Sequence, residues 1–184
     1  CASSTHYNEE DICTETHTKL KSKYKNLLTI IIPRHIQRAN KIKNEIQKLN
    51  LKVHMHDSKK KIDPQTDIYL VNSFGQTKSF FKICKTVFLG GSIIKHGGQN
   101  PLEAVRYGCN VIHGPNIWNF EEIYSLLRKY GVSNKIMNSS QLTVKINKIF
   151  NTKVNSKNIE IKIKKLGNKI LNSTFNEIDY FINH

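Results

Sequence analysis

The segment 87–103, VFLGGSIIKHGGQNPLE, carries the residue types and spacing that most clearly predict chemistry. Its apolar start predicts a strand, its two glycine pairs predict a tight turn, and Asn100 followed by Pro101 predicts a helix start. Backbone N–H groups at such a start have no partner within the helix, and they favour anions, phosphate above all. Glu103, further into the helix, could accept hydrogen bonds from ribose hydroxyls. The segment therefore predicts a site for a sugar nucleotide.

A capped helix without a ligand is the alternative for the same residues. Asn100-x-x-Glu103 fits a capping box, in which the third helical side chain bonds back to the N-cap, and Asn119-x-x-Glu122 repeats that pattern. The paired glycines favour the ligand, because glycine costs backbone entropy unless its freedom or its missing side chain is used.

Arg34 is the basic side chain that best fits phosphate. It directly follows an apolar run and Pro33, and it is one of only four arginines among 29 basic residues. A guanidinium offers a planar, two-point fork that lysine lacks. His6 also follows a strand-like run, and its alternative is a histidine bonded within its own loop.

Strand-like runs alternate with helical patterns along the chain. We predict strands over 1–5, 28–33, 51–55, 67–71, 86–89 and 109–113. We predict helices over 8–23, 36–49, 76–84, 101–107, 119–129 and 140–150. This alternation predicts an α/β fold, with a Rossmann-like parallel sheet covered by helices on both faces. Ligands of such sheets bind beyond the carboxyl ends of the strands, where both Arg34 and the glycine loop fall.

Residues 1–150 are predicted to form this domain, and residues 151–184 a long amphipathic helix. Apolar residues recur at helical spacing from Ile159 to Phe181, with lysines between them, and Gly167 predicts a bend. We expect the helix to pack on the same domain or on a missing N-terminal half. A basic amphipathic helix can also lie on a membrane surface.

The composition fits one domain of 184 residues, and no apolar run is long enough to span a bilayer. Four cysteines far apart, without C-x-x-C spacing, indicate a reducing, cytoplasmic setting and no metal site. The net charge of +15 is spread along the chain. It could attract an anionic membrane or nucleic acid non-specifically, but no RNP, KH or zinc-finger pattern indicates specific nucleic-acid binding.

Four segments in order resemble the motifs of the bacterial 3-deoxy-D-manno-octulosonic acid (Kdo) transferases of lipid A assembly. The family's STH-x-x-EE, PRH-x-x-R, D-T-M-G-E-L and GGS…GGHNPLE elements resemble segments 4–10, 33–38, 72–77 and 90–103. A Gly-Pro and an Asn-Phe follow, at 114–115 and 119–120, as in the family. The resemblance covers roughly residues 2–128, and the ordered set is far more specific than any single motif.

The resemblance implies the donor-binding, C-terminal half of a GT-B glycosyltransferase, and a start at Cys1 rather than Met suits such a fragment. The implied activity is transfer of Kdo from CMP-Kdo to a lipid A precursor, in lipopolysaccharide biosynthesis at the cytoplasmic side of the inner membrane. No cofactor is implied. The family's general base is a glutamate of the N-terminal domain, so we expect no catalytic residue here and nucleotide binding without turnover.

By resemblance, the CMP part of the donor contacts Pro33, Arg34, Gly75, Gln76, Thr77, Asn100, Pro101, Leu102 and Glu103. Additional candidates are His6, Gly91, Ser92, Gly97, Gly98 and Gln99. Amides of the glycine loop, together with Arg34, are expected to stabilise the departing phosphate.

Gln76 and Gln99 depart from the family's Glu and His, so each removes a charge or a titratable group. A helix start with a Ser73 N-cap is the alternative for segment 75–77. The alternatives for the whole chain are a GT-B enzyme that uses another nucleotide sugar, such as a UDP-sugar, and a non-enzymatic basic nucleic-acid-binding protein.

Overall fold

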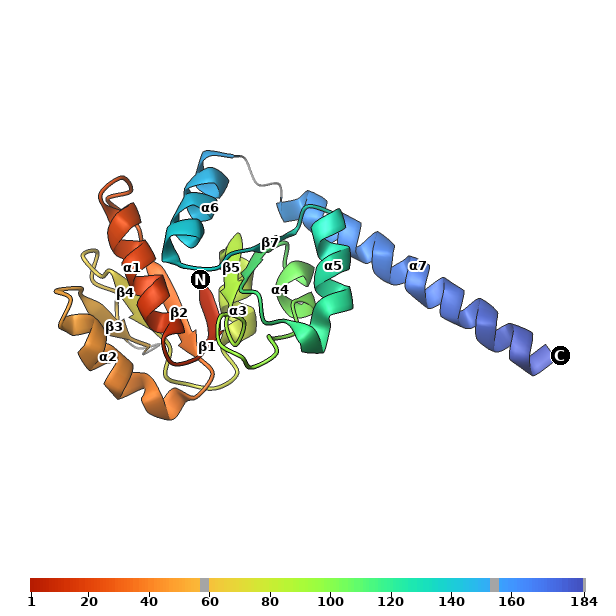
Figure 1. Ribbon diagram of the computed structural model, residues 1–184, viewed down its shortest axis with the longest axis horizontal. Coiled ribbons are helices and arrows are strands. Elements are labelled where there is room, and N and C mark those ends of the chain that lie inside the picture. Colours follow the sequence, from red (N-terminus) through yellow and green to blue (C-terminus); the bar gives the residue numbers. More distant parts are fainter. Residues whose placement is uncertain (57–59, 153–155, 184) are drawn as a thin grey trace.

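The computed structural model describes residues 1–56, 60–152 and 156–183. Its centre is one sheet of seven parallel strands in the order β3-β4-β2-β1-β5-β6-β7 (Figure 1). The strands are β1 Ala2–Thr5, β2 Thr29–Pro33, β3 Val53–Met55, β4 Ile68–Leu70, β5 Thr86–Leu89, β6 Asn110–His113 and β7 Ser133–Lys135. The helices are α1 Glu9–Lys21, α2 Ala39–Gln47, α3 Thr77–Ile83, α4 Leu102–Arg106, α5 Glu121–Lys129, α6 Ser139–Asn151 and α7 Ser156–Asn183. Short 3-10 turns precede α2 and α5, namely η1 Ile36–Arg38 and η2 Trp118–Phe120.

Alternate residues of the strands point to opposite faces of the sheet, and apolar clusters cover both faces. Ile31 and Phe88 pack with α1, α2 and α6, whereas Val87 and Leu89 pack with α3, α4 and α5. Both faces are therefore buried, and central strands such as β2 and β5 read as nearly continuous apolar runs in the sequence. The predicted α/β fold, with helices on both faces of a parallel sheet, is confirmed.

The six predicted strands and the helices between them are found, with ends shifted by at most three residues. Strand β7 was not predicted. Its sequence, Ser-Asn-Lys, has no apolar residue, because it lies at the edge of the sheet and only one neighbour, β6, pairs with it. Periodicity alone gives no signal for such a short polar strand.

Helix α7 starts against the domain and then leaves it (Figure 1). Ile159 and Ile163 are buried in the core that contains α4, whereas Ile170, Phe175 and Phe181 are exposed. The helix runs without interruption through Gly167, where the sequence predicted a bend. The predicted terminal segment 151–184 also includes residues 153–155 and 184, which lie outside the described part of the chain.

All four cysteines are free. Cys109 is buried, and burial raises the pKa of its thiol to about 12, so it stays protonated at neutral pH.

Candidate functional site

The candidate residues lie on loops that leave adjacent strands at one edge of the sheet. His6 follows β1, Arg34 follows β2, Gly75 follows β4, and the loop 90–101 follows β5. Strands β4, β2, β1 and β5 are consecutive neighbours, so their carboxyl ends form one continuous edge. The chain order reverses between β1 and β5, which is where parallel sheets of this kind bind ligands. Segments far apart in the sequence are thus brought together at a single place.

Glu9 holds the first glycine turn of that edge. Its carboxylate is fully buried and accepts hydrogen bonds from the backbone amides of Gly91 at 2.7 Å, Ser92 at 3.0 Å and Ile93 at 2.9 Å. The amide of His6 donates a fourth, at 2.9 Å. A carboxylate in such a nest of amides is well stabilised, because charge-assisted bonds in a buried setting are strong. Glu9 therefore ties the loop after β1 to the loop after β5.

This contact corrects the expected role of the glycine-loop amides. Gly91 and Ser92 were expected to offer theirs to a phosphate, but both already donate to Glu9. The amide of Gly98 is also used, since it donates to the carbonyl of Gly91 at 2.8 Å. In effect the protein's own carboxylate occupies the anion site that the sequence predicted at the first glycine turn.

Close packing explains the glycines of the loop. A Cβ on Gly90 would lie 2.3 Å from the Ser4 carbonyl oxygen, and one on Gly97 would lie 2.2 Å from the Asn119 amide nitrogen. Gly91 and Gly97 also have positive φ angles, of 64° and 94°. The glycines are thus needed for close packing within the protein, whereas the sequence analysis explained them by a bound ligand.

Arg34 and Arg38, four residues apart, have different surroundings. The guanidinium of Arg38 makes a two-point contact with the mostly buried carboxylate of Glu10, whereas Arg34 is exposed. Within the described part of the chain, the side chain of Arg34 has neither an ion pair nor a hydrogen bond. Its backbone is fixed, because its amide donates to the Thr5 carbonyl at 2.9 Å. Arg34 is thus a free cation on a rigid backbone.

The start of α4 is organised differently from the predicted capping box. The Asn100 side-chain oxygen accepts from the amide of Leu102 at 2.9 Å, and α4 begins at Leu102 rather than at Pro101. The carboxylate of Glu103 does not reach back to Asn100; it is half-exposed and lies 3.9 Å from the Lys78 ammonium. Among the described residues, the amides of Gln99 and Asn100 have no hydrogen-bond acceptor, and the same holds for those of Glu103 and Ala104 in the first turn of α4.

The segment 75–77 lies beside this helix start. Gly75 has φ 78°, and Gln76 rather than Ser73 precedes the first residue of α3. The ion pair between Lys78 of α3 and Glu103 of α4 joins the two segments. The start of α3, with Gln76 and Thr77, therefore lies close to the start of α4.

His6, a candidate from the sequence, gathers here with two histidines that the sequence did not single out, His35 and His96. The ring of His6 lies 4.3 Å from that of His96 and 5.7 Å from that of His35, centroid to centroid. His6 is buried, and burial is the main reason why the pKa of its imidazole is below the ordinary value, with the charges of His96, His35 and Arg38 adding to that effect and Glu9 opposing it. Sequence reasoning missed this cluster because its members are distant in the chain.

Two buried aromatic residues, Tyr124 and His113, lie next to the loop that follows the second glycine pair. Tyr124 of α5 donates its hydroxyl to the Gln99 carbonyl at 2.9 Å, and its ring lies 4.3 Å from that of His113. Burial lowers the pKa of His113 to about 4, so this ring is neutral at pH 7. The loop is thus held by Tyr124 at Gln99 as well as by Glu9 at its first glycine turn.

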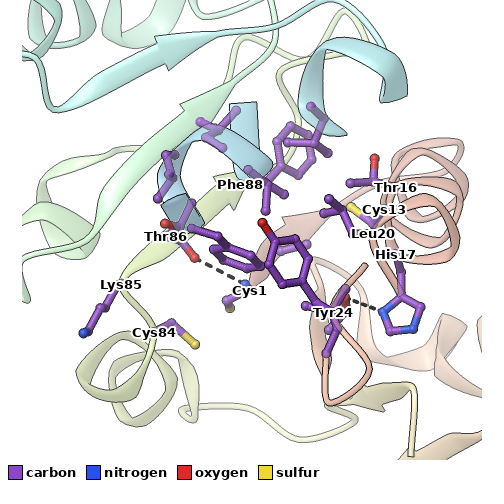
Figure 2. Close-up of a pocket in the computed structure, with 18 of the residues that line it drawn as sticks. Cys1, Cys13, Thr16, His17, Leu20, Tyr24, Cys84, Lys85, Thr86 and Phe88 are labelled. Carbon is purple, nitrogen blue, oxygen red and sulfur yellow. Dashed lines mark hydrogen bonds between the residues drawn. The ribbon is translucent and has the colours of Figure 1, made fainter. Parts of the chain in front are cut away.

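A separate cavity of about 670 Å³ opens at the opposite edge of the sheet (Figure 2). It is lined by residues at the starts of strands, including Cys1 and Thr86, and by apolar side chains of α1 and α6. His17 projects at its side and contacts the Thr29 hydroxyl at 2.9 Å. Its walls are mostly apolar, whereas the carboxyl edge offers free amides and a free guanidinium. The carboxyl edge therefore fits the nucleotide site predicted from the sequence better than this cavity does.

Two relatives cover most of the chain. The 3-deoxy-D-manno-octulosonic acid transferase of Haemophilus influenzae is 32% identical over 153 residues, which are 83% of this chain and 36% of that protein. The transferase of the same name from Aquifex aeolicus is 28% identical over 152 residues, 83% of this chain and 42% of that protein. This chain is a relative of the Kdo transferases. It spans less than half of either relative.

One solved structure has the same fold. The crystal structure of the C-terminal CMP-Kdo binding domain of WaaA from Acinetobacter baumannii matches with a TM-score of 0.81 at 24% identity, over 89% of this chain and 86% of that one. The fold is therefore that of the C-terminal, Rossmann-like half of a GT-B protein. No protein-family model matches the chain. Among the described residues, no helix is both long and apolar enough to cross a membrane.

Proposed function

We propose that this chain is the donor-binding part of a glycosyltransferase that moves Kdo from CMP-Kdo to a lipid A precursor. The observation that carries the proposal is the free guanidinium of Arg34, held at the carboxyl edge close to the switch point between β1 and β5. The relatives named Kdo transferases and the fold of a CMP-Kdo binding domain support the choice of donor.

The nucleotide would lie across the loops after β2, β4 and β5. Arg34 and the unused amides of Gln99 and Asn100 are donors for the phosphate, and charge on that phosphate grows as the sugar leaves. The carboxylate of Glu103 is exposed toward α3 and is an acceptor for ribose hydroxyls. The remaining members of the proposed CMP site are Pro33, Gly75, Gln76, Thr77, Pro101 and Leu102. Gly91 and Ser92 are left out as amide donors, because Glu9 accepts both of their N–H groups.

Catalysis and acceptor binding belong to parts of the enzyme outside this chain. We propose that a general base from an N-terminal domain completes the site, and that the assembled enzyme works at the cytoplasmic face of the inner membrane without a cofactor. Residues 1–150 would form the donor unit, and residues 151–184 an amphipathic helix that packs on this unit or on that domain. The exposed apolar side chains of Ile170, Phe175 and Phe181 support this role for the distal part of α7.

Calorimetry with CMP, CDP and UDP tests the proposal. We expect the 184-residue chain to bind CMP in preference to UDP, and to bind without turnover. A preference for the uridine diphosphate would instead indicate a UDP-sugar enzyme. Binding to nucleic acid with a steep salt dependence, and none to free CMP, would indicate a basic nucleic-acid-binding protein.

A further inference from the structure

The cavity of about 670 Å³ at the amino edge of the sheet has walls that suit an apolar chain (Figure 2). Its volume lies within the range of about 300–1,000 Å³ that is usual for small-molecule sites. Helices α1 and α6 and the first residues of β1 and β5 form much of its wall. Most of the lining side chains are apolar, and the buried ones include Cys13, Leu20, Phe88, Ile112, Leu142 and Ile149.

Two of the apolar lining residues are exposed, and they mark where the cavity opens to solvent. Leu28 is 38% exposed and Phe150 is 46% exposed. The ring of Phe150 meets that of Tyr24 edge to face, with the centroids 5.1 Å apart, and the Tyr24 hydroxyl donates to Asn147 of α6 at 2.8 Å. These contacts fix the end of α6 against the loop after α1. A ligand that enters here would remove exposed apolar surface from water, which favours its binding.

The segments that line the cavity carry only positive charge. Residues 16–29, 84–88 and 142–152 contain four, one and two lysines, respectively, and no aspartate or glutamate. Two acidic residues next to these segments are already paired, because Glu15 lies 2.6 Å from Lys19 and Asp67 lies 3.0 Å from Lys21.

Three of these lysines can bind an anion at the opening. Lys85 itself lines the cavity, whereas Lys25 and Lys148 belong to the lining segments of the loop after α1 and of α6. All three are exposed, and within the described ranges none of them forms an ion pair. A negative group at the opening would therefore be attracted without having to displace a carboxylate.

We propose that this cavity binds a single-chain anionic amphiphile, of the chemical class of the long-chain fatty acids. Its acyl chain lies between α1 and α6, and its head group lies among the lysines at the opening. The site goes beyond the proposed function, since it lies at the opposite edge of the sheet from the loops that carry Arg34 and Asn100. Nucleotide and amphiphile can therefore be bound at the same time.

Calorimetry with octanoate, decanoate and dodecanoate, each below its critical micelle concentration, tests the acyl site. A buried CH₂ group tightens binding by about fourfold, so each step of two carbons should tighten binding by about fifteenfold. Leu28→Trp places a larger side chain at the opening and should weaken dodecanoate binding at least tenfold. Leu49→Trp, at an exposed leucine outside the lining of the cavity, is the matched control and should bind dodecanoate like the wild type.

A comparison of dodecanoate with neutral dodecanol tests the head group. Lys85→Gln combined with Lys148→Gln should weaken dodecanoate binding by about threefold to tenfold and leave dodecanol binding unchanged. Lys41→Gln combined with Lys95→Gln removes the same charge from exposed lysines near the carboxyl edge, and should leave the binding of both ligands unchanged.

Equal affinities for octanoate and dodecanoate, or equal dodecanoate binding by wild type and Leu28→Trp, would overturn the acyl site. Equal losses in the two double variants would show that only net charge matters, and would overturn the choice of an anionic ligand. Binding to phosphatidylglycerol vesicles without binding of monomeric dodecanoate would assign this face to a membrane surface and overturn the proposal as well. CMP binding, measured on the same samples, tests the proposed function separately, and saturating CMP should leave dodecanoate affinity unchanged.

Discussion

Arg38 and Glu10 make a two-point contact, with Nη1–Oε1 and Nη2–Oε2 distances of 3.1 Å each. The pair joins the start of α1 to the turn after β2, and the Thr5 hydroxyl also donates to Glu10 at 2.9 Å. Two arginines of one motif are therefore divided between two tasks. Arg38 holds the two loops together, and Arg34 remains free at the edge of the sheet.

Arg34→Lys is expected to weaken CMP binding while leaving the fold intact. Lysine keeps the charge but loses the two-point geometry, and a hydrogen bond to a charged group is worth about 1.5–3 kcal/mol. Calorimetry should therefore show a loss of about 10- to 150-fold in CMP affinity. Arg128→Lys, at an exposed position on α5, is the matched control and should bind CMP like the wild type. Unchanged affinity in Arg34→Lys would remove this residue from the site.

Glu9→Gln should destabilise the protein strongly. The amide group keeps only one acceptor oxygen, so its nitrogen would face backbone N–H groups that now donate to the second oxygen of Glu9. A buried donor without an acceptor costs about 1–3 kcal/mol, and we expect a loss of about 3 kcal/mol in the free energy of unfolding. Urea denaturation provides the measurement. Glu45→Gln, on the exposed side of α2, should change it by less than about 0.5 kcal/mol, and equal effects of the two changes would contradict this account of Glu9.

The sequence predicted the layers of the fold well, because long apolar runs and helical patterns are local signals. It predicted the edge of the sheet where the candidate residues meet, since that follows from the chain direction in a parallel sheet. It could not predict that Glu9 fills the amide nest of Gly91 and Ser92, because these residues lie more than 80 positions apart. The contacts of His6 with His35 and His96 could not be predicted for the same reason, since they join distant parts of the chain.

The stability of the protein should fall on acidification partly because of His113. Burial lowers its folded-state pKa to about 4, below the ordinary value of 6.5, so between these values the unfolded chain binds more protons. The stability contributed by neutral His113 is therefore complete above about pH 6.5 and declines as the pH falls toward 4. At pH 4.5 we expect a loss of about 2.5 kcal/mol from this group.

His113→Asn isolates that contribution, because an amide nitrogen can still donate to the Gly114 carbonyl while the titration is removed. Between pH 7 and pH 4.5, the free energy of unfolding should fall by about 2.5 kcal/mol less in the variant than in the wild type. Denaturation curves at the two pH values provide the measurement. His6 and His17, whose pKa values are also lowered by burial, titrate in both proteins and cancel in the comparison. The same pH dependence in both proteins would show that His113 is not buried and neutral.

Glu103→Gln should reduce the preference for CMP over 2′-deoxy-CMP. A carboxylate is a stronger acceptor for a ribose hydroxyl than an amide, so wild-type chain should discriminate and the variant should lose much of that discrimination. Stability should change by less than about 0.5 kcal/mol, because Asn100 rather than Glu103 accepts from the first turn of α4. Equal discrimination between the two nucleotides by wild type and variant would show that Glu103 does not bind the ribose.

Gly90→Ala and Gly131→Ala separate close packing from backbone conformation. A Cβ on Gly90 would lie 2.3 Å from the Ser4 carbonyl oxygen and 2.6 Å from Thr5 Cα, both of them backbone atoms that cannot move without displacing β1. Gly131 has φ 70° but nothing within 4 Å of the added atom, so only the strain of the left-handed backbone applies. That strain costs about 1–2 kcal/mol, whereas we expect Gly90→Ala to cost at least about 3 kcal/mol, in the range of severe overpacking.

Because the displaced loop also carries His6 and the Glu9 contacts, Gly90→Ala should weaken CMP binding as well, and Gly131→Ala should not. Denaturation and calorimetry on the same two variants provide both measurements. A loss of unfolding free energy in Gly90→Ala no greater than that in Gly131→Ala would show that the loops after β1 and β5 are not closely packed against each other.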